Sequence, residues 1–277
     1  MKRALRALFA LSLAPSAVLA APVELAPHAA TYALTLERAQ PRSGIVAAGG
    51  EITLRFEGGA CTGYAITSRL RLDLTLRRQG ERRLEWRAQS WAAADGASFD
   101  YMERELINGR VGKAYRLRFA RPAPDGPARV RFVKPRGKPV RQPLPAGTLL
   151  PHETMQRLIA AGRAGKGHLS FHAFEGFDDG MARRVSAVIA PVKEDAATTR
   201  AARPLAGLRS WWVALAYYPP AAKKGDDRAG FGVPEFEVGY RLYENGVITN
   251  LRLIYARYSL KGRLTKLDML KASSDCR

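Results

Sequence analysis

Alternation of apolar and charged side chains is the first regularity along the chain, and it is clearest from Ile66 to Arg77. A period of two places alternate residues on opposite faces of an extended strand. The segment is therefore predicted to be a half-buried antiparallel strand with one solvated face. Its leucines are Leu70, Leu72, Leu74 and Leu76, and the charged residues facing the other way are Arg69, Arg71, Asp73 and Arg77.

Turn-forming pairs separate this run from similar alternating runs at 115–119 and 236–242. Asn-Gly suits a type I′ hairpin turn because both residues tolerate positive φ. A hairpin is predicted in which Glu235 to Tyr243 leads into Asn245-Gly246 and Val247 to Ile254 returns. The turn signals are Gly49-Gly50, Gly58-Gly59, Asp95-Gly96, Asn108-Gly109, Asp125-Gly126, Asn245-Gly246 and Lys261-Gly262.

One segment departs from the strand pattern, after the proline-rich stretch Pro139 to Pro151. From His152 to Arg163 the apolar residues recur at helical spacing, which predicts a short amphipathic helix. Strands on both sides of one helix indicate a mainly β fold, a single antiparallel sheet curled into a β-spiral or open barrel around that helix. The alternative is two sandwiches joined by a linker from Pro191 to Pro204.

The N-terminus has the order of a secretory signal peptide. Lys2, Arg3 and Arg6 precede an apolar stretch and then small residues up to Ala21. We expect a signal peptide over residues 1–20, cleaved after Ala20 or Ala21, and one periplasmic domain over 21–277. The apolar stretch is shorter than the about 20 residues that span a bilayer, and no transmembrane segment is expected in the mature chain.

Charge narrows the choice of partners. The chain has 45 Lys+Arg, 25 Asp+Glu and a formal net charge of +20, and losing the three basic leader residues leaves +17. Such a charge would favour binding to nucleic acid. Because the chain is expected to be exported, however, we expect no nucleic-acid partner, and anionic envelope surfaces are the expected polyanions. Compositional bias towards arginine is the alternative. The candidate anion-binding run is Arg129, Arg131, Lys134, Arg136, Lys138 and Arg141.

The two cysteines, Cys61 and Cys276, are the next candidate pair. An even cysteine count in an exported chain favours a disulfide over free thiols. An intermolecular bridge and a metal pair are the alternatives, although no histidine or further cysteine lies near either residue in the sequence to complete a metal site.

No catalytic motif is found. The Gly-x-Ser-x-Gly and Ser-x-x-Lys patterns are absent from a strand-to-helix context, and the four histidines, His28, His152, His168 and His172, match no zinc motif. His168 and His172 are interpreted as surface or turn residues, and Asp179-Gly180 beside Glu175 and Asp178 as a turn. We expect no catalytic residue, metal or cofactor. Pro219 to Pro234 is predicted to be a mobile loop.

Aromatic residues gather in Ser210 to Pro220. This segment is interpreted as a core strand with aromatic ends. In a curled sheet, Trp211, Trp212 and Tyr217 would also be candidates to line an apolar cavity for a lipid or acyl chain.

The order of motifs resembles the EipB family of periplasmic cell-envelope integrity proteins. The resemblance spans nearly the whole predicted mature chain and departs at Tyr64, where the family has Trp, and at His152-Glu153-Thr154, where it has His-Thr. It rests on these segments: His28 to Leu36, Ser43-Gly44, Gly59 to Tyr64, Leu144 to Pro151, Trp211 to Tyr218, Asn245 to Val247, and Cys276.

The resemblance implies a long antiparallel sheet wound around a helix, a disulfide between Cys61 and Cys276, and a non-enzymatic role in the envelope. The first hypothesis is thus a non-catalytic periplasmic factor that binds an envelope protein, a lipid or a lipoprotein. The alternatives are a periplasmic hydrolase of cell-wall or lipid substrates and a basic adaptor for anionic envelope polymers. An apolar cavity would favour the lipid or lipoprotein carrier, a Ser/His/carboxylate cluster would favour the hydrolase, and a continuous basic face without a pocket would favour the adaptor.

Overall fold

The computed structural model describes residues 23–123, 126–133, 140–192, 199–220 and 232–272. Within these residues the secondary structure is almost entirely strand, with one α-helix and two short 3-10 helices, η1 (Pro41–Ser43) and η2 (Arg200–Leu205). The helix is α1 (Pro151–Arg163), and the strands are β1 (His28–Ala39), β2 (Ile45–Gly59), β3 (Gly63–Leu76), β4 (Gly80–Ala92), β5 (Ser98–Ile107), β6 (Arg110–Ala120), β7 (Ala128–Val133), β8 (Val140–Leu144), β9 (His168–Ala173), β10 (Arg183–Pro191), β11 (Ser210–Tyr218), β12 (Phe236–Tyr243), β13 (Ile248–Tyr255) and β14 (Tyr258–Met269).

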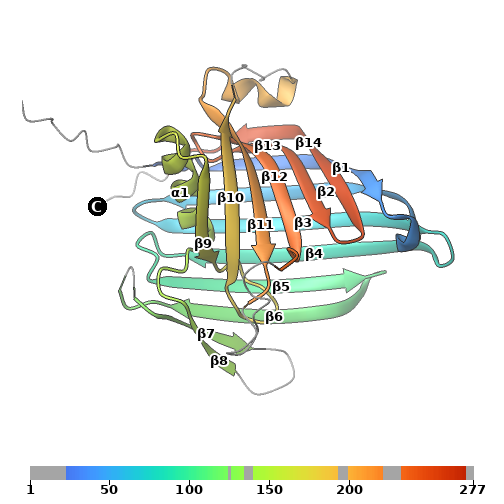
Figure 1. The fold of residues 1–277 in the computed structure, drawn as a ribbon, viewed down its shortest axis with the longest axis horizontal. Coiled ribbons are helices and arrows are strands. Elements are labelled where there is room, and N and C mark those ends of the chain that lie inside the picture. Colours follow the sequence, from blue (N-terminus) through green and yellow to red (C-terminus); the bar gives the residue numbers. More distant parts are fainter. Residues whose placement is uncertain (1–22, 124–125, 134–139, 193–198, 221–231, 273–277) are drawn as a thin grey trace, which may run out of the picture.

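All of these strands belong to one 14-stranded sheet, with the order β8-β7-β6-β5-β4-β3-β2-β1-β14-β13-β12-β11-β10-β9. Neighbouring strands pair antiparallel, and β1 pairs with β14 so that the first and last strands lie side by side. The sheet curls until β9–β11 lie across β3–β6 (Figure 1). The prediction of a curled antiparallel sheet is confirmed, and the alternative of two separate sandwiches is not what the chain forms.

The sheet is not closed into a barrel. Its edges are β8 and β9, the two strands that flank α1 in the sequence. Among the described residues, an isolated parallel bridge between Leu149 and Ala173 is the one backbone pairing that links the segment after β8 to the end of β9. Among the described helices, none has the length and apolar character that a bilayer span requires.

Strand β3 shows why the alternating pattern was a reliable signal. Leu72 and Leu74 are 2% and 8% exposed, whereas Arg71 and Asp73 between them are exposed. The predicted hairpin is also present as β12 and β13, with Gly246 in the turn at φ 88°. Only Gly246 of that Asn-Gly pair has positive φ, so the turn is not type I′; Asn108 and Gly109 both have positive φ, as type I′ requires.

Two predicted turns are wrong, because Gly49-Gly50 lies inside β2 and Lys261-Gly262 inside β14. A Cβ atom at Gly50 would lie 2.0 Å from the carbonyl oxygen of Arg71, and one at Gly262 would lie 3.0 Å from the Leu251 side chain. These glycines therefore allow close approach between neighbouring strands. The proline-rich stretch is also not all loop, because Val140–Leu144 forms the edge strand β8, where a proline is tolerated.

Helix α1 packs against one end of the curled sheet. Pro151 occupies its first turn, and the Glu153 carboxylate accepts a hydrogen bond from the Leu150 backbone N–H at 2.8 Å. Leu158 and Ile159 are fully buried in the largest core cluster, with residues of β9 to β13. The predicted helix is thus confirmed, one residue longer than expected at its N-terminus.

Candidate functional site

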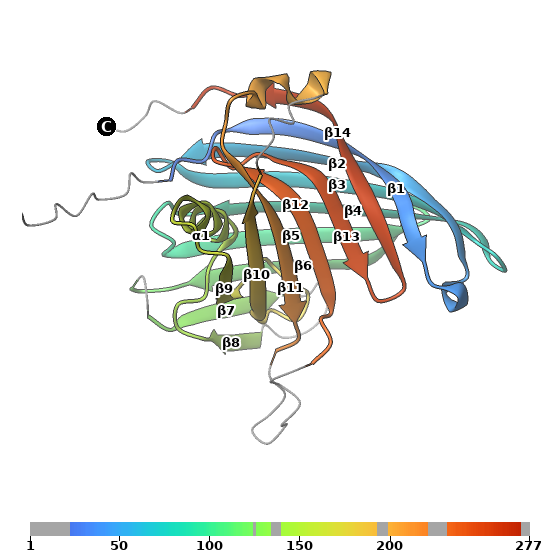
Figure 2. The same ribbon diagram turned by 45° about the horizontal axis from the view of Figure 1, so that its top comes forward.

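A large cleft opens between the inner face of the sheet and the turn that joins β13 to β14. Its volume is about 1130 Å³. Strands β1 to β4 extend well past the ends of β11 to β13, so the far part of their inner face is left uncovered (Figure 2). Eight half-buried or buried apolar and aromatic side chains and the more exposed Tyr255 contribute to its walls; the eight are Ile52, Leu70, Leu74, Leu84, Trp86, Ile107, Leu253 and Tyr258.

Arginines surround this apolar surface. None of the five makes an ion pair with a described residue, and four of them are exposed, Arg82 being half-buried. They come from η1, the β3–β4 turn, the start of β4 (Arg82) and the β13–β14 turn, and the first and last of these elements are far apart in the sequence. The five are Arg42, Arg77, Arg78, Arg82 and Arg257. We call this site the arginine-rimmed cleft.

Two tyrosines stand at the edge of the cleft beside Arg257. The rings of Tyr255 and Tyr258 lie 5.1 Å apart between centroids. Burial raises the pKa of Tyr255 to about 12 and also raises the pKa of Tyr258. Both hydroxyls therefore stay protonated at neutral pH and can donate hydrogen bonds to an anionic group.

A second cavity of about 420 Å³, the middle cavity, shares Trp86 with the cleft. Glu103 on its wall accepts a hydrogen bond from the Tyr101 hydroxyl at 2.5 Å. The Tyr115 hydroxyl lies 2.8 Å from the same carboxylate and 2.8 Å from the Gly176 carbonyl. Burial raises the pKa of both tyrosines, so they remain donors.

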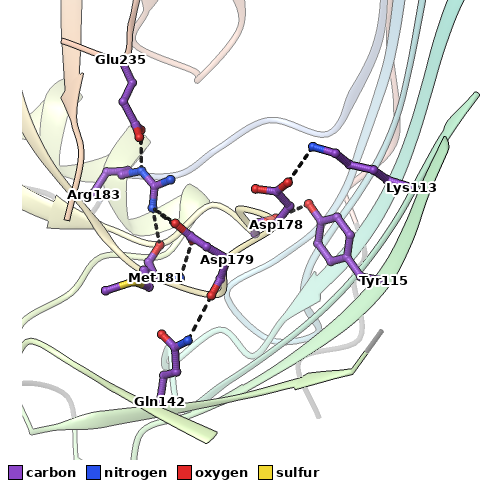
Figure 3. Close-up of polar contacts among 9 residues, drawn as sticks. Lys113, Tyr115, Gln142, Asp178, Asp179, Met181, Arg183 and Glu235 are labelled. Atoms are coloured by element: carbon purple, nitrogen blue, oxygen red, sulfur yellow. Dashed lines mark hydrogen bonds and ion pairs between the residues drawn. The ribbon is translucent and has the colours of Figure 1, made fainter. Parts of the chain in front are cut away.

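The segment between β9 and β10 crosses this cavity and is held there by polar contacts (Figure 3). Lys113 on β6 contacts Asp178 at 2.7 Å, and Gln142 on β8 donates to the Asp179 carbonyl at 3.2 Å. The buried Arg183 joins Asp179 at 2.9 Å to Glu235 at 2.6 Å. These contacts tie β6 and β8 to the opposite layer, so they hold the open sheet in its curled form.

Glu175, in the same segment, also lines the middle cavity. Its carboxylate accepts a hydrogen bond from the Tyr217 hydroxyl at 2.8 Å. Burial raises the pKa of Glu175 despite that bond. The carboxyl group is therefore more easily protonated than a surface glutamate, which suits an interior that is otherwise largely apolar.

A third cavity, of about 180 Å³, lies beside α1 and shares Ile66 and Pro151 with the middle cavity. Its wall includes His28, Phe56 and His152. The rings of His28, Phe56, Tyr64 and His152 follow one another, with centroid distances of 5.7, 5.8 and 4.5 Å. Burial, with the cation of Arg121 nearby, lowers the pKa of His152 to about 4, so its ring is neutral at pH 7.

The fold and these cavities can be compared with known proteins. A family model described as EipB-like matches residues 19–271. The chain belongs to the EipB-like family. The cell envelope integrity protein EipB of Brucella abortus is 29% identical over 260 residues, covering 92% of this chain and 88% of the relative. A solved beta-barrel-like protein of a domain of unknown function, also from Brucella abortus, superposes with a TM-score of 0.78 at 26% identity, covering 90% of this chain and all of that one.

Within this EipB-like chain, the predicted aromatic candidates do not form one site. Trp211 and Tyr217 are buried in the core, but Trp212 is 44% exposed because neighbouring residues of β11 point to opposite faces. The aromatic side chains that line the cleft and middle cavity include Trp86, Tyr101 and Tyr115. Their signal in the sequence was their position on the inner face of alternating strands.

The other predicted site residues are only partly described. Arg129, Arg131 and Arg141 are exposed on β7 and β8, whereas Lys134, Arg136 and Lys138 lie outside the described residues. Cys61 lies in the turn between β2 and β3, and Cys276 lies outside the described residues, so their pairing stays a prediction. The predicted signal peptide and most of the predicted loop Pro219 to Pro234 also lie outside them.

His168 and His172 lie on the edge strand β9 and not in a turn, His168 exposed and His172 half-buried, whereas His28 and His152 are buried, which the sequence did not indicate. His168 Nε2 lies 3.2 Å from Ser186 Oγ, and no carboxylate among the described residues contacts that histidine. Across the described residues, no three His, Cys, Asp or Glu side chains are grouped so as to hold a metal ion.

Proposed function

We propose that the protein is a periplasmic, non-catalytic factor that supports cell-envelope integrity by holding an anionic amphiphile in the arginine-rimmed cleft. The ligand class is a lipid or the acyl chain of a lipoprotein with a phosphate or carboxylate near the chain. The name of the Brucella abortus relative supports the envelope role. The ligand class rests on the cleft itself.

One observation carries this proposal: an apolar cleft of about 1130 Å³ is rimmed by arginines that have no ion-pair partner among the described residues. Ligand pockets for small molecules range over roughly 300–1,000 Å³, so the cleft has room for a long apolar chain. Arginine binds phosphate and carboxylate groups with paired hydrogen bonds. The two features together match a molecule with an apolar tail and an anionic head.

The geometry also orients the ligand. Arg78 and Arg257 are exposed residues of two turns that line the cleft, whereas Trp86 is half-buried and also lines the middle cavity. The head group would therefore sit at the mouth and the tail would point towards Trp86. Burying the tail there removes apolar surface from water, which is the main favourable contribution to binding of this kind.

A displacement assay with a long-chain fluorescent fatty acid tests the proposal. The double charge reversal R78E/R257E should weaken binding of the fatty acid at least about tenfold, because two attractive charges become repulsive. Binding of an uncharged monoacylglycerol should change much less. Leu84→Asp, in the wall of the cleft, should weaken both ligands because it places a charge in the apolar surface.

The matched control is R203E/R263E, which changes the net charge equally at exposed sites that do not line the cleft. It should bind the fatty acid like the unchanged protein. Equal binding by R78E/R257E and this control would contradict the assignment of the head-group site. Hydrolysis of an ester probe by the purified protein would instead support the hydrolase alternative, for which the exposed pair His168 and Ser186 is the site to mutate.

The periplasmic location is a separate part of the proposal. Export with cleavage after Ala20 or Ala21 would give a mature protein that begins at Ala21 or Pro22. N-terminal sequencing of protein recovered from the periplasm tests this directly. A protein that retains Met1 and stays in the cytoplasm would contradict it.

A further inference from the structure

The outward face of strands β3 to β8, turned away from the cavities, is dense in arginine. Four of its arginines make ion pairs: Arg83 with Asp73, Arg69 and Arg87 with Glu85, and Arg118 with Asp100. Six others are exposed and make no ion pair with any described residue: Arg71, Arg104, Arg116, Arg129, Arg131 and Arg141. We call this surface the outer arginine face.

Carboxylates do not balance these charges. Besides the three already paired, Glu81 at the far end of β4 is the one further carboxylate on this face among the described residues of β3 to β8. The described part of β7 and β8 carries no acidic residue at all. The face therefore has a net positive charge that is concentrated towards the β8 edge of the sheet.

Register places like charges directly opposite one another. Arg131 on β7 is paired with Arg118 on β6 and with Arg141 on β8. Arg87 on β4 is likewise opposite Arg104 on β5. Like charges at directly opposite positions destabilise a sheet, and an external anion that binds between them would remove that repulsion.

Apolar side chains lie in the middle of this basic surface. Trp91 is 42% exposed, and Val133 is 37% exposed. Trp91 lines a groove of about 460 Å³, and Met102, Val133 and Arg116 line both this groove and an adjoining one of about 690 Å³. An exposed tryptophan surrounded by arginines is typical of a surface that contacts lipid head groups, because the indole ring prefers the membrane interface.

We infer that the outer arginine face docks the protein on a bilayer surface rich in anionic phospholipid head groups, with Trp91 entering the head-group layer. An extended face with charges on several strands and an apolar centre suits a surface better than a single small ligand. This inference rests on a different face from the arginine-rimmed cleft and does not depend on the cleft holding a lipid.

Vesicle co-sedimentation with the mature protein tests the inference. The protein should bind vesicles of phosphatidylcholine with phosphatidylglycerol, should not bind vesicles of phosphatidylcholine alone, and should dissociate as salt is raised. Each basic residue near an anionic leaflet strengthens binding about fivefold. R116E/R131E should therefore weaken binding at least about tenfold. Trp91→Ser, which leaves the net charge of the protein unchanged, should weaken binding by a smaller factor.

The control R203E/R263E changes the net charge by the same amount on other elements and should bind these vesicles nearly as well as the unchanged protein. Because Arg116 and Arg131 are exposed, circular dichroism of the variant should match that of the unchanged protein. An equal loss in the control would show that net charge alone drives binding and would overturn the inference. Absence of binding to the anionic vesicles, or tighter binding to soluble polyglutamate than to them, would overturn it as well.

Discussion

Arg121, directly after β6, is joined to Glu153 in the first turn of α1 by an ion pair of 2.5 Å. The Arg121 side chain is 2% exposed, and it also donates to the Thr148 carbonyl at 2.9 Å. Glu153 in turn accepts the Leu150 N–H, so one buried guanidinium connects the sheet to the start of the helix. This pair fixes where α1 stands against the β6 end of the sheet.

Replacing Arg121 with methionine should destabilise the protein strongly. The change leaves the Glu153 carboxylate without its cation, and breaking a buried ion pair from one side costs about 3–5 kcal/mol. Urea denaturation measures the free energy of unfolding. The matched control is Arg118→Met, which removes an exposed pair with Asp100 and should cost at most about 1 kcal/mol. Similar losses in the two variants would contradict the role given to Arg121.

His152 should make stability depend on pH. Its pKa is about 4 in the folded protein and 6.5 when unfolded, so the unfolded chain binds the proton first as pH falls. This contribution to stability is complete above pH 6.5 and is lost towards pH 4, by about 3 kcal/mol in all. Between pH 7.5 and pH 4.5 the unchanged protein should therefore lose more unfolding free energy than His152→Phe, which has no imidazole to protonate. The difference in unfolding free energy between the two should change in the direction that favours the variant. A gap that does not change with pH would contradict a buried neutral imidazole.

Gly162 allows α1 to lie against Trp211. A Cβ atom there would be 2.6 Å from the indole ring, which is itself buried. Although alanine favours a helix more than glycine does, Gly162→Ala should destabilise the protein by about 1–3 kcal/mol because the crowded ring has to move. Trp211→Leu in the same chain should recover part of that loss, as a double-mutant cycle would show. If the two changes simply add, the contact does not limit the packing of α1.

The pairing of Cys61 with Cys276 stays a prediction. A thiol assay on unreduced, unfolded protein should find no free thiol in the monomer. The loop that the bridge would close is more than two hundred residues long, so reduction should lower the free energy of unfolding by up to about 5 kcal/mol in the chain-entropy model. Two reactive thiols, or a covalent dimer on non-reducing gels, would contradict an intramolecular bridge.

The strands were predictable because their signal is local. Leu72 and Leu74 alternate with charged residues over a long run, and burial of one face leaves little freedom of register. The helix was predictable for the same reason, since Leu158 and Ile159 have helical spacing and a proline precedes them. Gly50 and Gly262 were misinterpreted as turns because a glycine that admits a neighbouring strand has the same sequence signal as one that bends the chain.

The candidate site was not predictable because its parts are distant in the sequence. Arg78 and Arg257 line one cleft, although they are far apart in the sequence, because β1 pairs with β14 and brings the two ends of the chain together in the sheet. The burial of His28 and His152 likewise depends on the packing of α1 against the sheet. The basic run at 129–141 was visible, but its continuation to Arg104 and Arg116 depends on the register of β5, β6 and β7.

Native mass spectrometry of the protein purified from its own envelope is the most direct test of the central claim. The account predicts a fraction with added mass that dissociates on activation and is identified as an anionic lipid or an acylated peptide. That fraction should be lost in R78E/R257E and kept in R203E/R263E. A bare protein mass in every preparation, or an adduct that R78E/R257E retains unchanged, would contradict a ligand held in the arginine-rimmed cleft.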